Sequence, residues 1–159
     1  MATLRHTRYQ AAIIRDGAIL LLRCAHTNGP TVWMLPGGGR EDYESEEACV
    51  QREVLEETCL VARVEELLMD TPAEPPDGTY TRWRTYRCSA LDGEAAPGGG
   101  EGSAELIGVM WLPLADEQLW PAEIYDDVFV YPQLVAIRAS LKLAAGQSVD
   151  LRDSSLERR

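Results

Sequence analysis

Apolar positions in the first part of the chain follow the pattern of two buried strands joined by a tight turn. Residues 11–14 and 18–22 form continuous apolar runs, and Asp16-Gly17 stands between them. Asp-Gly favours a type I′ turn, because both central positions of that turn take positive φ. The pattern therefore predicts a hairpin over residues 9–24.

Further strands are expected where short apolar or β-branched segments lie between turn-forming stretches. The loops are predicted in the Pro- and Gly-rich segments 71–78 and 93–103. The segment between these two loops is rich in Thr, Tyr and Trp, residues that favour strands. The remaining strands are predicted over 32–35, 61–69, 79–90 and 107–112.

Two segments have the apolar spacing of helices. The first is expected to begin after Ser45 as its N-cap, with acidic residues in its first turn, and to end at Thr58. The second covers 132–145 and stops at Gly146, before a polar tail over 147–159. Because strands and helices do not alternate strictly, the pattern indicates an α+β fold with a mixed sheet in a single domain, 1–159.

Composition narrows the classes of protein that fit. The chain has 159 residues and a net charge of −11, so binding to a nucleic acid polymer is not expected. No apolar run approaches the roughly 18 residues of a membrane span, and no secretory signal is visible at the N-terminus. The four cysteines show no metal-finger spacing and are interpreted as reduced thiols of a cytoplasmic protein.

The first predicted helix carries three carboxylates on one side. At 3.6 residues per turn, Glu53, Glu56 and Glu57 fall within an arc of about 100°. Such crowding of like charges destabilises an isolated helix, and a hard divalent cation removes the repulsion. Magnesium with water and substrate phosphate in its remaining positions would suit cleavage of a pyrophosphate.

The residues around these carboxylates fit the same chemistry. The turn at residues 37–39 consists of glycines, which let the backbone approach a metal or phosphate closely and leave a carbonyl oxygen available. Arg52 lies beside the acidic face, where its guanidinium group can hold a carboxylate in a bidentate contact. A Walker loop is excluded, since no Gly-Lys-Ser/Thr follows the glycines.

Taken together, residues 38–60 resemble the Nudix box, G-x5-E-x7-R-E-U-x-E-E-x-G-U, in which U is a bulky aliphatic residue. The chain matches from Gly38 through Glu44 to Leu60, with Cys59 in place of the usual Gly. A non-Gly residue in the left-handed turn at that point costs roughly 1–2 kcal/mol. Segment 33–37 before the box and segment 111–114 after it also resemble this MutT-like family.

The resemblance implies a Nudix-type α/β/α sandwich and a Mg²⁺-dependent pyrophosphohydrolase, with Mn²⁺ as a substitute ion. Glu53, Glu56, Glu57 and the carbonyl of Gly37 would bind the metal. Arg52 and Glu44 would orient these groups. The substrate would be a small nucleotide, and a homodimer would be in keeping with the family.

The general base is not fixed by the box. The family often takes it from a glutamate in a loop before a later strand, where this chain has Glu101 and Glu105. We expect Glu105 to be the base, with Glu101 and Glu56 as the alternatives.

A cluster of cations and aromatic residues in the predicted strand 79–90 gives a candidate substrate surface. Aromatic rings can stack on a base, and guanidinium groups can hold phosphate. A paired, solvent-facing strand with a core aromatic is the competing interpretation. The candidates are Arg82, Trp83, Arg84 and Tyr86.

The substrate itself stays open between a nucleoside triphosphate, ADP-ribose and a nucleotide sugar. Pro75 stands where ADP-ribose-cleaving members carry a proline, in a Pro-rich turn, whereas positions 76–78 lack the tyrosine of dinucleoside-polyphosphate members. The alternative function is a catalytically inactive nucleotide sensor on the same fold, and a third is an acidic interaction protein. The intact box carboxylates favour the enzyme.

Overall fold

A mixed sheet forms the centre of the computed structural model, which describes residues 6–73, 79–99 and 104–141. The seven strands are β1 (Thr7–Arg15), β2 (Ala18–His26), β3 (Val32–Met34), β4 (Gly37–Gly38), β5 (Ala62–Pro72), β6 (Arg82–Ala90) and β7 (Ala104–Pro113). The main path runs β3-β2-β1-β6-β5, while β4 pairs with β1 and β7 pairs with β2. Since β1 and β6 are parallel and the other pairs are antiparallel, the sheet is mixed, as predicted.

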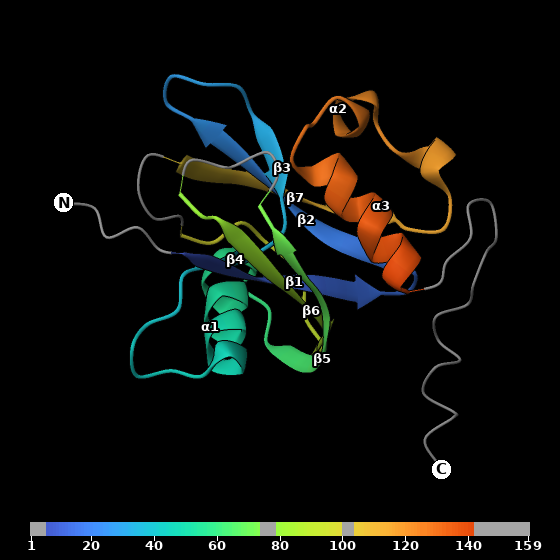
Figure 1. Ribbon diagram of the computed structural model, residues 1–159. Coiled ribbons are helices and arrows are strands. Elements are labelled where there is room, and N and C mark those ends of the chain that lie inside the picture. Colours follow the sequence, from blue (N-terminus) through green and yellow to red (C-terminus); the bar gives the residue numbers. More distant parts are fainter. Residues whose placement is uncertain (1–5, 74–78, 100–103, 142–159) are drawn as a thin grey trace, which may run out of the picture.

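Helices cover the sheet from two sides. The helical segments are α1 (Glu46–Thr58), the short 3₁₀ turn η1 (Glu117–Leu119), α2 (Ala122–Tyr125) and α3 (Val130–Ser140). Figure 1 shows α1 on one side of the strands and α2 and α3 on the other. The arrangement is the expected α/β/α sandwich.

The alternation of side chains along the first two strands explains this layering. Ala11, Ile13 and Leu20 pack with the buried face of α1, whereas Ile19 and Leu21 belong to the cluster that contains α3. Successive residues of a strand point to opposite faces, so strands that are covered on both sides read as continuous apolar runs. The apolar runs in the sequence therefore reflect two cores that share one sheet.

Local signals in the sequence located the hairpin and the first helix correctly. Asp16 and Gly17 have φ values of 51° and 78°, as a type I′ turn requires. The Ser45 side chain accepts a hydrogen bond from Ala48 N at 3.1 Å, so it caps α1 as predicted.

Several predicted boundaries were wrong. The second main helix begins at Val130, ahead of Pro132, because the Asp127 carboxylate accepts hydrogen bonds from the backbone N–H groups of Phe129 and Val130 at 2.9 Å each. Pro132 then sits in the first turn, where its missing N–H is not needed. Strand β6 begins at Arg82 instead of residue 79.

Other segments were missed or lie beyond the described part. Strand β4, η1 and α2 are too short to give a periodic pattern. The predicted helix stop at Gly146, the polar tail 147–159 and the Pro-rich residues 74–78 lie outside the described residues. The single-domain interpretation of 1–159 therefore stays a prediction. No helix within the described ranges is long and apolar enough to cross a membrane.

Candidate active site

The glycines that precede α1 are held tightly against the first strand. Gly37 pairs with Gln10 and Gly38 with Tyr9 in the short β1–β4 ladder. A Cβ atom on Gly37 would lie 2.4 Å from the carbonyl oxygen of Tyr9. A Cβ atom on Gly38 would lie 2.3 Å from Oε1 of Glu53. Both positions therefore require glycine because of close approach, one to backbone and one to a carboxylate.

The three box carboxylates lie beside this glycine turn, as the helical spacing predicted. Glu53 is buried against Gly38, and Glu57 accepts a hydrogen bond from Gly37 N at 2.8 Å. Glu56 lies one turn from Arg52, and its side chain is 44% exposed. The helix thus presents two sequestered carboxylates and one that solvent reaches.

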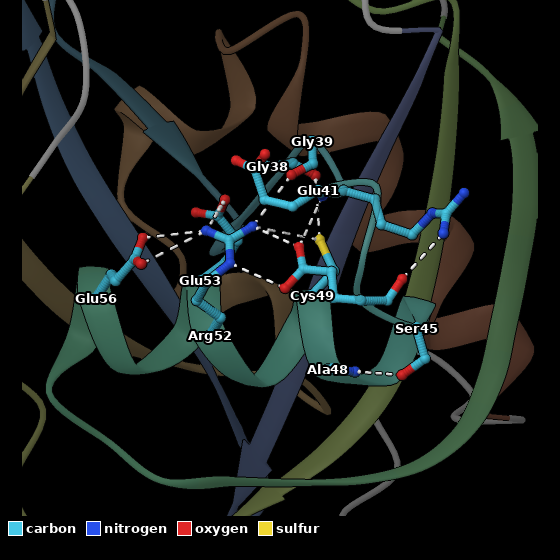
Figure 2. Close-up of polar contacts among 11 residues, drawn as sticks. Gly38, Gly39, Glu41, Ser45, Ala48, Cys49, Arg52, Glu53 and Glu56 are labelled. Atoms are coloured by element: carbon cyan, nitrogen blue, oxygen red, sulfur yellow. Dashed lines mark hydrogen bonds and ion pairs between the residues drawn. The ribbon is translucent and has the colours of Figure 1, made fainter.

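Arg52 connects the acidic residues to the turn (Figure 2). Its guanidinium group donates to both carboxylate oxygens of Glu44, at 2.8 and 3.1 Å. It also donates to Glu53 Oε1 at 3.0 Å, to Glu56 Oε2 at 3.3 Å and to the carbonyl oxygen of Gly39 at 3.2 Å. A bidentate pair with Glu44 fixes the plane of the guanidinium group, which in turn orients the carboxylates of α1.

The two sequestered glutamates and Glu44 differ in their electrostatic surroundings. The hydrogen bonds from Arg52 lower the pKa of Glu44 to about 2, so that carboxyl is an anion throughout the physiological range. Burial raises the pKa of Glu57 to about 7, against the opposing charge of Arg8. Burial also raises the pKa of Glu53. A nearby cation stabilises the ionised form of carboxylates that are buried together in this way.

The donor set of this site fits a hard divalent cation. Glu53, Glu56 and Glu57 offer carboxylate oxygens, and the glycine turn offers backbone carbonyls. In the described residues, however, no three acidic, thiol or imidazole groups already converge as an ion cage. The reason is that Arg52 engages two of these glutamates and Gly37 N–H engages the third. An ion would therefore compete with these contacts for the same oxygens.

A pocket of about 370 Å³ opens in front of the carboxylates. Its acidic floor is formed by the three box glutamates and the glycine turn. Its aromatic wall comes from separate parts of the chain and consists of Trp33, Tyr80, Trp83 and Phe129. Arg8 and Gln133 add polar groups to the lining. A concave site with apolar walls and a few polar groups is the usual form of a small-molecule site.

Of the four candidates on β6, the structure brings only Trp83 to this pocket. Alternate residues of a strand point to opposite faces, so Arg82, Arg84 and Tyr86 lie on the other side. Arg82 and Arg84 pair with Asp70, and Arg84 also contacts Glu46 at 3.1 Å. Tyr86 donates to Glu46 and packs with the α1 core.

Of the two loop candidates for the general base, the structure describes only Glu105. Glu105 lies in β7, paired with Ala25, and is exposed at a position that does not line the pocket. Glu101 lies outside the described residues. Glu56, the third candidate, lines the pocket.

The C-terminal end of α1 shows how Cys59 replaces the usual glycine. Cys59 adopts the left-handed conformation, with φ 63° and ψ 12°, and its N–H donates to Leu55 O. The loop after β6 completes the cap, because Ala96 N and Gly98 N donate to the carbonyl oxygens of Thr58 and Glu57. The substitution therefore keeps the helix end that the box needs.

Sequence reasoning missed part of the lining. Arg8, Trp33, Tyr80, Phe129 and Gln133 were not proposed as site residues. The parallel pairing of β1 with β6 places Arg8 beside Trp83. Parallel pairing joins segments distant in sequence and leaves no local signal.

The family model of the NUDIX domain matches residues 5–131, which include every element that builds this pocket except most of α3. The chain belongs to the NUDIX family. It is a Nudix hydrolase, an enzyme that acts on pyrophosphate-type anhydride bonds, as the box predicted. No curated protein matches the chain.

Solved structures with the same fold resemble this Nudix hydrolase over most of its length. An ADP-ribose pyrophosphatase from Streptococcus suis is 23% identical, with a TM-score of 0.62, over 86% of this chain and 92% of that chain. A MutT NUDIX hydrolase from Burkholderia pseudomallei is 24% identical, with a TM-score of 0.61, over 84% and 95%. A UDP-X diphosphatase is 26% identical, with a TM-score of 0.63, over 89% of this chain and 64% of that one.

Proposed function

We propose that this Nudix hydrolase is a magnesium-dependent pyrophosphohydrolase. Its substrate would be a nucleoside diphosphate linked to another group, as in a nucleoside triphosphate, ADP-ribose or a nucleotide sugar. The observation that carries the proposal is the pocket itself, in which three glutamates of α1 form the floor and four aromatic residues form the wall. The floor suits metal-bound phosphate, and the wall suits a base.

Glu53, Glu56 and Glu57 would hold Mg²⁺, or Mn²⁺ in its place, with the Gly37 carbonyl as a further ligand. The bound ion would neutralise phosphate oxygens and lower the pKa of a water molecule. Arg52 is a positioning residue in this proposal, because it fixes Glu53 and Glu56 while Glu44 fixes Arg52.

The geometry favours Glu56 over Glu105 as the proton acceptor for the attacking water. A general base must lie within hydrogen-bond reach of the water that it activates, directly or through one further water. Glu56 lines the pocket and is partly open to solvent, whereas Glu105 is exposed on β7 away from the lining. We therefore assign the base to Glu56.

The aromatic wall supports a nucleotide as the substrate. Trp83 is 5% exposed and lines the pocket, so its ring can stack on a base at little entropic cost. Two of the structural neighbours are named for an ADP-ribose and a UDP-X reaction, which agrees with a nucleotide diphosphate. The placement of Arg82, Arg84 and Tyr86 argues against a direct substrate role for these three.

Two expectations about the cellular state remain part of the proposal. A cytoplasmic location is supported by four free cysteines, of which Cys24, Cys49 and Cys88 are buried. A homodimer stays an expectation from the family.

The proposal is tested by a hydrolysis screen with Mg²⁺ over nucleoside triphosphates, ADP-ribose, nucleotide sugars and dinucleoside polyphosphates. Glu57→Gln is the matched variant, because the amide oxygen still accepts from Gly37 N while the negative charge is lost. We expect the variant to lose activity about 100-fold or more and to keep the thermal stability of the metal-free protein.

The same screen compares Glu56 and Glu105 as candidates for the base, while Glu101 stays the third candidate. We expect Glu56→Gln to reduce kcat by about 100-fold and Glu105→Gln to leave it unchanged. The opposite result would return the base to β7. If Mg²⁺ binds but no compound is hydrolysed, the nucleotide-sensor alternative would replace the enzyme.

A further inference from the structure

Arg8 places a positive charge at the edge of the acidic floor. It is the second residue of β1, and it pairs in register with Trp83 of β6, so both side chains reach the pocket. Its Nη2 donates to the carbonyl oxygen of Leu35 at 2.9 Å, just before the glycine turn. The guanidinium carbon lies 5.9 Å from the centre of the Tyr80 ring. These contacts hold the side chain in the pocket wall.

Within the described part of the chain, the charge of Arg8 is not balanced by an ion pair. Among the described residues, no carboxylate lies within 4.0 Å of its guanidinium group, although three glutamates share the pocket with it. A partly buried cation without a counter-ion is unfavourable, because burial weakens its hydration. Only one of its five N–H groups donates to a protein acceptor in the described residues, the carbonyl oxygen of Leu35. The remaining donors can form a fork for phosphate oxygens.

The pocket needs such a cation if it receives an anionic substrate. Its floor carries Glu53, Glu56 and Glu57, which repel phosphate. Arg8 is the one arginine in the lining formed by described residues, and that lining contains no lysine. Arg8 shares the lining of this single pocket with all three glutamates. Arg8 therefore lies close enough to act on the same substrate as the glutamates.

We propose that Arg8 binds the diphosphate of the substrate from the edge of the floor that the metal-binding glutamates form. The diphosphate would then be held between two positive charges, the bound ion on the floor and Arg8 at the edge. This inference rests on the proposed function, because it assumes a substrate with a diphosphate. It adds a phosphate-binding residue that the Nudix box does not contain.

A purely structural role for Arg8 makes a different prediction. If its only function is to hold Leu35 and the glycine turn in place, its removal would disturb Glu53 and Glu57 and weaken metal binding. If Arg8 binds phosphate, its removal takes away a charge that repels the metal ion. The two roles therefore predict opposite changes in Mg²⁺ affinity.

The test compares wild type, Arg8→Gln, Arg8→Lys and the control Arg63→Gln by calorimetry. Arg63 is exposed on β5 and does not line the pocket. The probes are Mg²⁺ alone and inorganic pyrophosphate in the presence of Mg²⁺, at about pH 8.5 so that the glutamates are ionised. Pyrophosphate carries the diphosphate without base or sugar, so it reports on the phosphate contact alone.

We expect Arg8→Gln to weaken pyrophosphate binding about tenfold or more and to leave Mg²⁺ binding equal or tighter. Arg8→Lys should lose only part of the affinity, and Arg63→Gln should match wild type. Weaker binding of both probes to Arg8→Gln would overturn the proposal in favour of a structural role. Unchanged pyrophosphate affinity, or no pyrophosphate binding by wild type, would overturn it as well. The hydrolysis screen with Glu57→Gln decides the proposed function independently of these results.

Discussion

Single atoms decide whether the acidic floor can form. Gly38 leaves room for Glu53, whose carboxylate occupies the space that a Cβ atom would take. Gly37 does the same for the backbone of β1. The two adjacent glycines thus leave room for different neighbours: Gly38 for the Glu53 side chain and Gly37 for strand β1. The sequence predicted that these glycines let the backbone approach a metal or phosphate, and the structure shows that they also leave room for β1 and for Glu53.

Gly38→Ala should inactivate the enzyme without unfolding it. The added Cβ would lie 2.3 Å from Glu53 Oε1, so the carboxylate must move away from the floor. Displacement of a reacting group by about 1 Å can reduce activity about 100-fold. Steady-state kinetics would measure the loss, with Gly108→Ala as control, since its Cβ would be 3.8 Å from Arg23 Cβ. Normal kcat in Gly38→Ala would contradict this account of the glycine.

At the scale of elements, α1 is defined by its two ends. Ser45 caps the N-terminus, and the left-handed Cys59 together with the loop after β6 caps the C-terminus. Gly98 fits this arrangement closely, because a Cβ there would lie 1.9 Å from Glu56 O. The helix that carries the carboxylates is therefore fixed between two caps, and one of them contains a residue under conformational strain.

Cys59→Gly should stabilise the protein. Left-handed φ costs a non-Gly residue roughly 1–2 kcal/mol, while glycine adds roughly 0.5–1 kcal/mol of entropy to the unfolded chain. A net gain of up to about 1.5 kcal/mol is expected, measured by urea unfolding of metal-free protein. Cys59→Val should destabilise instead, because a β-branched side chain disfavours this conformation more strongly. Equal stability of the Gly and Val variants would contradict the strain.

At the scale of the whole molecule, the site depends on two cores built on one sheet. One core joins α1 to the strands, and the other joins α3 to the opposite face. The pocket draws residues from both sides, since Glu57 comes from α1 and Gln133 from α3. Gln133 is held by Gln10, whose Nε2 donates to Gln133 Oε1 at 2.6 Å. The two layers must therefore form together for the pocket to have its shape.

Leu134→Ala should destabilise the molecule by about 2–5 kcal/mol, because Leu134 is fully buried in the α3 core and its removal leaves a cavity. Val135→Ala, at a 43% exposed neighbour on the same helix, should change stability by less than about 0.5 kcal/mol. Chemical denaturation of both variants gives the comparison. A small effect of Leu134→Ala would mean that α3 contributes little to folding.

The sequence by itself determined the features that depend on neighbouring residues. The hairpin turn follows from Asp16-Gly17, and the register of Glu53, Glu56 and Glu57 follows from the helical repeat. These are local because turn dihedrals and helix periodicity are set within a few residues. The box and the family could therefore be identified from the sequence alone.

Only the tertiary structure decided which residues face the carboxylates across the pocket. Arg8 and Trp83 meet because β1 and β6 pair in parallel, and the face of β6 that carries Trp83 leaves Arg84 and Tyr86 on the other side. The sequence of a strand shows which side chains share a face. It does not show which face lines the site, since that depends on pairing with distant strands. For the same reason, we predicted four substrate-binding residues on β6 from the sequence, and only Trp83 among these four lines the pocket.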